Sequence, residues 1–144
     1  MPAYLAADLM VVFHALYVGF VVGGLVVVWV GWTAGWNWIR NFWFRIIHLA
    51  AIGLVAVEAV FGWTCPLTDW ENWLREQAGQ TPYPGDFLAY WAHRLLYWDA
   101  PQEFFWTLHI LFFVIVLGTF WWIPPRWPTR PDQHLQIPQR GHQS

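Results

Sequence analysis

Polar side chains inside or beside long apolar stretches are the groups of this chain that could do chemistry. Glu58 lies in the apolar stretch 42–63. A carboxylate at membrane depth costs about 2.5–3.5 kcal/mol on insertion scales, so such a residue is a functional-site candidate whose partner must be found. The companions that the sequence offers are His14, His48, His93, His109, Asp8 and Cys65.

Helix geometry predicts which of these side chains share a depth. Counted at ~1.5 Å per residue from the predicted helix ends, His14, Glu58 and His109 fall into one layer in the outer half of a membrane. His93, on a short outer helix, is within reach of that layer, and Asp8 lies above it.

The other two candidates lie on the same predicted helix as Glu58 or at its end. Cys65 follows Glu58 by about two helical turns, so both occupy one helix face, with Cys65 nearer the outer surface. No cation adjacent in sequence lowers the pKa of this thiol, and we expect it to be inert. His48 lies ~15 Å deeper than Glu58, toward the opposite half of the membrane.

Three interpretations of this layer are open. In the first, the polar groups pair across helices and fix the helix register, as they commonly do in membrane bundles. In the second, imidazoles and a carboxylate bind a divalent ion such as zinc or iron, although no local HxxH or HxxxH spacing supports it. In the third, His14 and His109 are the axial ligands of a b-type haem.

The composition is typical of a membrane protein. Of 144 residues, 58% are hydrophobic and 11% are charged, whereas soluble domains average about 25% charged residues. The lipid bilayer is therefore an expected partner, and a net charge of −2 without a basic field makes nucleic acid an unexpected one. The chain is also tryptophan-rich, with 14 tryptophans, most of which cluster at the two predicted membrane edges, as in interfacial belts.

The predicted fold is an all-α membrane protein with three transmembrane helices and two short interfacial helices on the outer face. The spans cover about 4–32, 42–63 and 101–123, and each is long enough for a ~30 Å hydrocarbon core. Pro66 is expected to stop the second span. The short helices occupy about 68–79 and 86–98. One transmembrane domain, 1–123, is thus followed by a Pro-rich tail, 124–144.

Local signals predict two helix starts. Thr68-x-x-Glu71 is typical of a capping box at the start of the first short helix. Asp99-x-x-Gln102, with Pro101 in the first turn, is typical of the start of the third span. The short connector between the first two spans predicts that they run antiparallel.

Arginine placement predicts the orientation. The cations Arg40 and Arg45 lie between the first two spans, and Arg126, Arg130 and Arg140 follow the last. The positive-inside rule makes that side cytoplasmic, so the N-terminus is expected to be periplasmic and the tail cytoplasmic, in a bacterial inner membrane.

A run of unusual residues resembles a known family. The segment Gly62-Trp63-Thr64-Cys65-Pro66-Leu67-Thr68, followed by Glu71-Asn72-x-Leu74-Arg75, is similar to the pattern of a small bacterial membrane family catalogued as domain of unknown function 2784. The resemblance covers about 4–123 and extends to Asp8, His14, His48, Glu58 and His93, but not to His109. It implies a multi-helix inner-membrane protein and implies no activity.

The function predicted from these features is that of a small accessory or assembly subunit of a larger membrane complex, or of a homo-oligomer. Gly19, Gly23 and Gly24 form a notch that lets another helix approach closely, and the tail offers a second contact. The alternative is a redox membrane protein whose His/Glu layer holds haem b or a divalent metal. No nucleophile, base and orienting group stand together in the sequence, so no reaction is predicted.

Overall fold

The computed structural model describes residues 2–128, and within that range the chain is entirely helical. The elements are α1 (Ala3–Thr33), the 3-10 helix η1 (Asn37–Arg40), α2 (Phe42–Phe61), α3 (Pro66–Gln77), α4 (Phe87–Leu96) and α5 (Gln102–Trp122). Three of them, α1, α2 and α5, are long and apolar enough to cross a membrane, which confirms the predicted all-α fold. The predicted tail lies outside the described residues from position 129 onward, as do Arg130 and Arg140.

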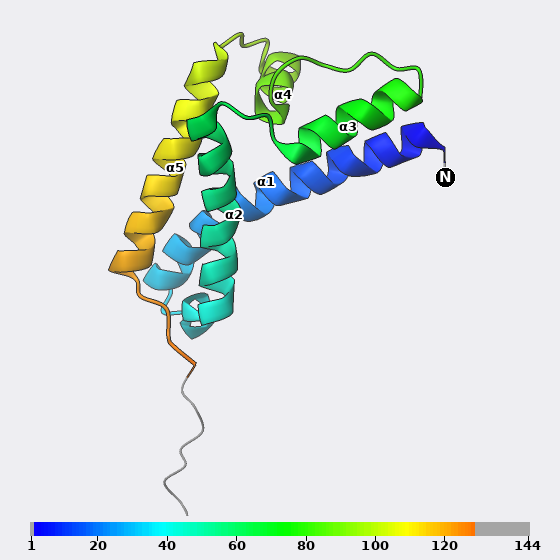
Figure 1. The fold of residues 1–144 in the computed structure, drawn as a ribbon. Coiled ribbons are helices and arrows are strands. Elements are labelled where there is room, and N and C mark those ends of the chain that lie inside the picture. Colours follow the sequence, from blue (N-terminus) through cyan, green and yellow to red (C-terminus); the bar gives the residue numbers. More distant parts are fainter. Residues whose placement is uncertain (1, 129–144) are drawn as a thin grey trace, which may run out of the picture.

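The long helices do not form a simple antiparallel series. α2 and α5 pack along each other, whereas α1 crosses α2 obliquely and places its N-terminal half beside α3 (Figure 1). A core of Val21, Ile52 and Val116 joins the three long helices. The lengthwise partner of α2 is therefore α5. The reason lies in the connector, where the buried Ile39 of η1 fills the space beside Gly31 and sets how the chain leaves α1.

Both predicted helix starts differ from the structure. α3 begins at Pro66, so Thr68 lies inside its first turn and forms no capping box with Glu71. α5 begins at Gln102 without a side-chain cap, and the Gln102 amide instead donates a hydrogen bond to Asp86. In both places the second residue of the predicted motif, Glu71 or Gln102, instead forms a tertiary hydrogen bond, to Tyr83 or to Asp86.

The end of α2 is set by a glycine. Gly62 has a φ of 66°, in the left-handed region, and the Trp63 N–H donates to the Glu58 carbonyl oxygen at 2.9 Å. This αL ending needs a residue without a Cβ penalty, and it terminates α2 before Pro66 is reached. The turn directs the following segment, with Cys65, back over the end of α2.

Two polar residues of α2 are buried between helices with hydrogen bonds that explain them. Arg45, which is 3% exposed, donates from Nη2 to the carbonyl oxygens of Thr119 and Ile123, and so caps the C-terminus of α5. His48 donates from Nε2 to the Val21 carbonyl oxygen at 2.7 Å. Its ring fits only because Gly24 has no side chain: a Cβ there would be 2.5 Å from His48 Cδ2.

A second polar group lies outside the long helices, and we call it the Glu71 clamp: Glu71, Asn72, Arg75 and Tyr83. The Glu71 carboxylate is fully buried and accepts hydrogen bonds from Arg75 and from the Tyr83 hydroxyl. Asn72 brackets the Tyr83 backbone, donating to its carbonyl and accepting from its N–H. Burial, together with the bond to Glu71, raises the pKa of Tyr83. The clamp ties the loop before α4 to α3 and thereby positions α4.

Candidate functional site

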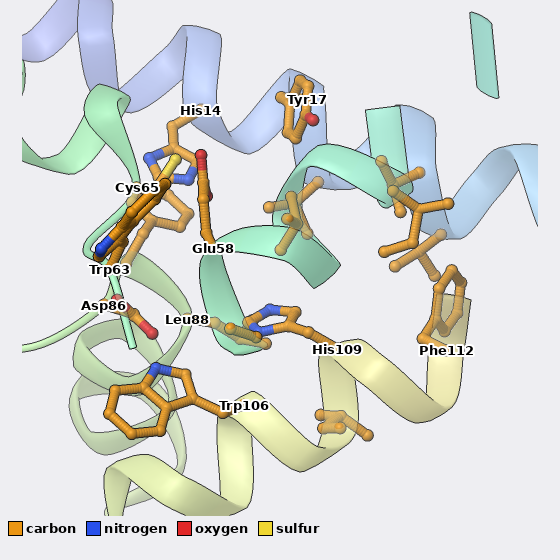
Figure 2. A pocket seen from close by; sticks show the side chains of 18 residues that line it. His14, Tyr17, Glu58, Trp63, Cys65, Asp86, Leu88, Trp106, His109 and Phe112 are labelled. Carbon is orange, nitrogen blue, oxygen red and sulfur yellow. The ribbon is translucent and has the colours of Figure 1, made fainter. Parts of the chain in front are cut away.

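A cavity of about 170 Å³ lies where α1, α2 and α5 meet the segments that carry Cys65 and α4 (Figure 2). Its wall is mostly apolar, with side chains such as Val18, Val21, Ile52, Val55, Leu88 and Phe112. Polar groups are concentrated at two places in this wall. Pockets of this kind, apolar with a few convergent polar groups, are the default candidates for ligand sites.

The first polar place, the His14 end of the cavity, consists of His14, Glu58 and Cys65, which point toward one another (Figure 2). His14 and Glu58 are each only 6% exposed. The His14 ring stacks on Phe87 with 4.0 Å between centroids, and its Nδ1 has no hydrogen-bond partner in the described part of the chain. A buried polar atom without a partner costs about 1–3 kcal/mol, so this end is poised to accept one from a ligand.

Cys65 is a neutral thiol at the edge of this end. Burial raises the pKa of Cys65 to about 11, and the neighbouring Glu58 carboxylate adds to the rise. The backbone N–H groups of Leu67 and Thr68 at the start of α3 act in the opposite direction but do not prevail. The thiol can therefore take part in hydrogen bonding but is not an activated nucleophile.

The second polar place, on the α5 side, combines His109, Asp86 and Trp106 (Figure 2). Asp86 precedes α4 and accepts a hydrogen bond from the Gln102 amide. Burial raises the pKa of this carboxyl, while the hydrogen bond from Gln102 limits the rise. This side is thus polar but already partly satisfied by the protein.

The cavity opens between side chains that the protein leaves uncovered. Its lining includes Val22, Trp63 and Leu108, whose exposed fractions are 47%, 60% and 39%. All three are large and apolar and belong to α1, to the turn after α2 and to α5. In a bilayer such an opening would face acyl chains, so an apolar molecule could enter without crossing water.

The structure brings only some of the candidate residues together. His14, Glu58, Cys65 and His109 line the same cavity. Asp8 is exposed near the start of α1 and does not line the cavity.

The remaining two histidine candidates have partners elsewhere. His93 faces solvent and pairs through Nδ1 with Asp99 at 2.6 Å. His48 bonds to α1, away from the cavity.

The cavity residues absent from the sequence-based candidates include Tyr17, Asp86 and Trp106. Helical spacing could have indicated two of them. Tyr17 follows His14 by three residues and Trp106 precedes His109 by three, so each pair shares a helix face. Tyr17 is a structural member, since its hydroxyl donates to the Ala51 carbonyl oxygen at 2.6 Å. Asp86 reaches the cavity only through the clamp-held loop and had no such signal.

The cofactor hypotheses can be tested against this geometry. Within residues 2–128, no group of three or more His, Cys, Asp and Glu side chains is arranged to hold a metal ion. His14 and His109 both line the cavity, but its volume of about 170 Å³ is close to that of a cavity that holds benzene. A four-ring haem macrocycle does not fit a space of that size between them.

Comparison with known proteins supports the sequence resemblance. No curated protein and no solved structure matches the chain. A family described as "Protein of Unknown function (DUF2784)" matches residues 4–125, which include all six helical elements apart from Ala3 at the start of α1, and every residue of the cavity. The chain therefore belongs to this family.

Proposed function

We propose that this chain is a membrane-embedded binding protein that takes the polar end of a small lipid-soluble molecule into its cavity. The observation that carries the proposal is the His14 end of the cavity. There a nine-tenths buried imidazole, whose Nδ1 has no partner in residues 2–128, and a buried carboxylate share one wall of an apolar space that opens between uncovered side chains.

The size and chemistry of the cavity define the class of ligand. A space of about 170 Å³ admits a single six-membered ring or the end of a chain. His14 and Glu58 call for hydrogen-bonding atoms on that ring, because a buried site with unpaired polar groups rejects analogues that lack them. A quinone or phenol ring with an apolar tail combines both properties, with the tail leaving past Trp63 and Leu108.

A benzoquinone with a short alkyl tail is the probe for this function. Added to the purified chain in detergent, it should quench tryptophan fluorescence, because Trp63 and Trp106 line the cavity. It should also raise the unfolding temperature, since a ligand at 100 times its Kd stabilises by about 2.7 kcal/mol. The corresponding alkylbenzene, which has no polar atoms, should bind far more weakly.

Matched variants of α2 separate site binding from partition into the micelle. Ala59→Leu places a larger side chain in the cavity wall and should abolish both effects of the probe. Ala50→Leu makes the same change at an exposed position of the same helix and should leave them intact. Equal binding of the quinone by Ala59→Leu and wild type would refute the proposal.

A second candidate function, that of an accessory or assembly subunit, is favoured by one specific observation. A Cβ added at Gly19 or Gly23 would meet nothing within 4 Å, whereas Gly24 beside them is packed against His48. The GxxxG notch of α1 is thus open to a helix of another chain or of a second copy. Gly19→Leu with Gly23→Leu should then reduce the apparent mass of the complex in mild detergent, and an unchanged mass would remove this candidate.

The location that fits both candidates is a bacterial inner membrane with the N-terminus periplasmic. Its support is the Arg40, Arg45 and Arg126 set at one end of the long helices. Arg45 caps α5 and is not a free surface charge, so Arg40 and Arg126 carry this argument in the described residues. A reporter fused after Ser144 should be found in the cytoplasm; a periplasmic reporter would reverse the orientation.

A further inference from the structure

Arg40 and Arg126 meet at the end of the long helices that is remote from the cavity. They line a surface pocket of about 270 Å³ between η1, the start of α2 and the chain that follows α5. Its other lining residues include two amides, Asn37 and Asn41, and the indole of Trp43. The pocket is separate from the cavity and plays no part in the function proposed above.

Hydrogen bonds hold the two arginines in place. The Arg126 N–H donates to the Arg40 carbonyl oxygen at 2.8 Å, and Arg126 Nη2 donates to Asn37 Oδ1 at 2.9 Å. Arg40 Nε donates to the Pro124 carbonyl oxygen at 3.0 Å. Each guanidinium has five N–H donors, so most remain available while the side chains are already positioned. Little rotamer entropy is then lost when an anion binds.

No carboxylate of the described chain neutralises these charges. The acids within residues 2–128 are Asp8, Glu58, Asp69, Glu71, Glu76, Asp86, Asp99 and Glu103. They belong to the N-terminal part of α1, the last turn of α2, and the segment from α3 to the first turn of α5, all remote from this pocket (Figure 1). The ion pairs in this range, Arg75–Glu71 and His93–Asp99, also belong to that other end.

The surroundings place the pocket at headgroup level. Trp38, Trp43 and Trp127 are 54%, 66% and 72% exposed around it, and exposed indoles of this kind favour the boundary between acyl chains and water. We propose that the pocket binds the phosphate group of an anionic phospholipid. Two arginine forks match a phosphate bidentately, and basic pockets beside membrane helices suit anionic headgroups.

Native mass spectrometry of the delipidated full chain in detergent tests this site. Phosphatidylglycerol should bind more tightly than phosphatidylcholine, which carries no net charge. Arg40→Gln and Arg126→Gln should each weaken phosphatidylglycerol roughly fivefold, which corresponds to the ~1 kcal/mol expected for one arginine near the surface. Arg94→Gln, an exposed arginine on α4, is the matched control and should change nothing.

Three results would overturn the inference. The first is equal binding of the two lipids, and the second is undiminished phosphatidylglycerol binding in the double variant. The third is full competition by inorganic phosphate at the lipid's own concentration, which would make the free anion the ligand. Arg40→Lys guards against a folding defect: it keeps the charge but loses the fork, and should retain part of the binding at an unchanged unfolding temperature.

Discussion

The Glu71 clamp and the His14 end of the cavity each bury a glutamate, but they treat it in opposite ways. In the clamp the carboxylate of Glu71 accepts hydrogen bonds from Arg75 and Tyr83. At the His14 end, Glu58 is 6% exposed beside a histidine whose Nδ1 has no partner in the described residues, and beside a thiol that burial keeps neutral. The clamp is complete as it stands, whereas the His14 end has hydrogen-bonding capacity left over.

The difference in hydrogen bonding distinguishes polar groups that stabilise the fold from polar groups that are available to a ligand. A buried polar group that serves the fold is paired, because an unpaired one lowers stability. His48 and Arg45 follow this rule inside the long helices, since each donates to main-chain carbonyl oxygens. His14 departs from it, because its Nδ1 has no partner in residues 2–128 and lies in the wall of a cavity beside Glu58. This is why we assign the two residues to a ligand.

Breaking the clamp should have the largest effect on stability. Glu71→Leu removes the shared acceptor, leaves the Tyr83 hydroxyl without its partner and leaves Arg75 with only its hydrogen bond to Gln80. Loss of one member of a buried pair costs about 3–5 kcal/mol, and the partial exposure of Arg75 points to the lower end of that range. Unfolding in detergent measures it, with the exposed Glu76→Leu as the control, expected within about 0.5 kcal/mol. Equal effects of the two changes would show that the clamp contributes nothing.

The glycine pair on α1 should give the next effect. Gly24→Ala pushes a Cβ into the paired His48 and should cost about 1–3 kcal/mol by overpacking. Gly23→Ala meets open space, so removal of a helix-interior glycine should leave stability unchanged or raise it by up to about 1 kcal/mol. Thermal unfolding of the two variants, measured side by side, tests both expectations. A Gly24→Ala chain as stable as wild type would mean that His48 is not held against α1.

Neutralising Glu58 should change stability less than either of the changes above, although Glu58 is also buried. Glu58→Gln keeps the shape and removes a buried charge, so we expect an unfolding free energy within about 1 kcal/mol of wild type, on the stabilising side. Binding of the quinone probe should nevertheless fall. A loss of several kcal/mol on this substitution would contradict the contrast with Glu71 and assign Glu58 a structural partner.

The smallest expected effect is on the rate at which Cys65 is alkylated. With a pKa of about 11, the thiolate fraction and hence the rate should rise about tenfold per pH unit between pH 8 and 10. The nearby carboxylate raises this pKa, so Glu58→Gln should lower it and make alkylation faster at a fixed pH. Bound quinone should slow the reaction. Rates that are flat with pH would mean that Cys65 is not a buried neutral thiol.

Much of the fold follows from pattern alone, because hydrophobicity and length are local properties. The stretches 4–32, 42–63 and 101–123 were predicted as spans, and α1, α2 and α5 occupy them to within a few residues. The helix starts at Thr68 and Asp99 were wrong for a tertiary reason. Glu71 and Gln102 found partners in Tyr83 and Asp86 that a sequence window cannot contain.

The cavity shows which site residues could be predicted from their depth along the helices and which could not. Counting along helices put His14, Glu58 and His109 in one layer, and all three line the cavity. The same count could not tell that His93 faces solvent and pairs with Asp99, because the direction of α4 is set by the loop that the clamp holds. The position of Asp86 in the cavity wall also depends on that loop.

By itself, the amino-acid sequence determined that the chain has three helices fit for a membrane, that its family is the one matched over residues 4–125, and that a few costly polar groups stand inside them. Only the tertiary structure decided which of those groups are satisfied. Pairing of a buried side chain depends on how helices cross, and the crossing of α1 over α2 depends on how the connector packs. That crossing places His14 beside Glu58 in the wall of the cavity and brings His48 against the Val21 carbonyl oxygen.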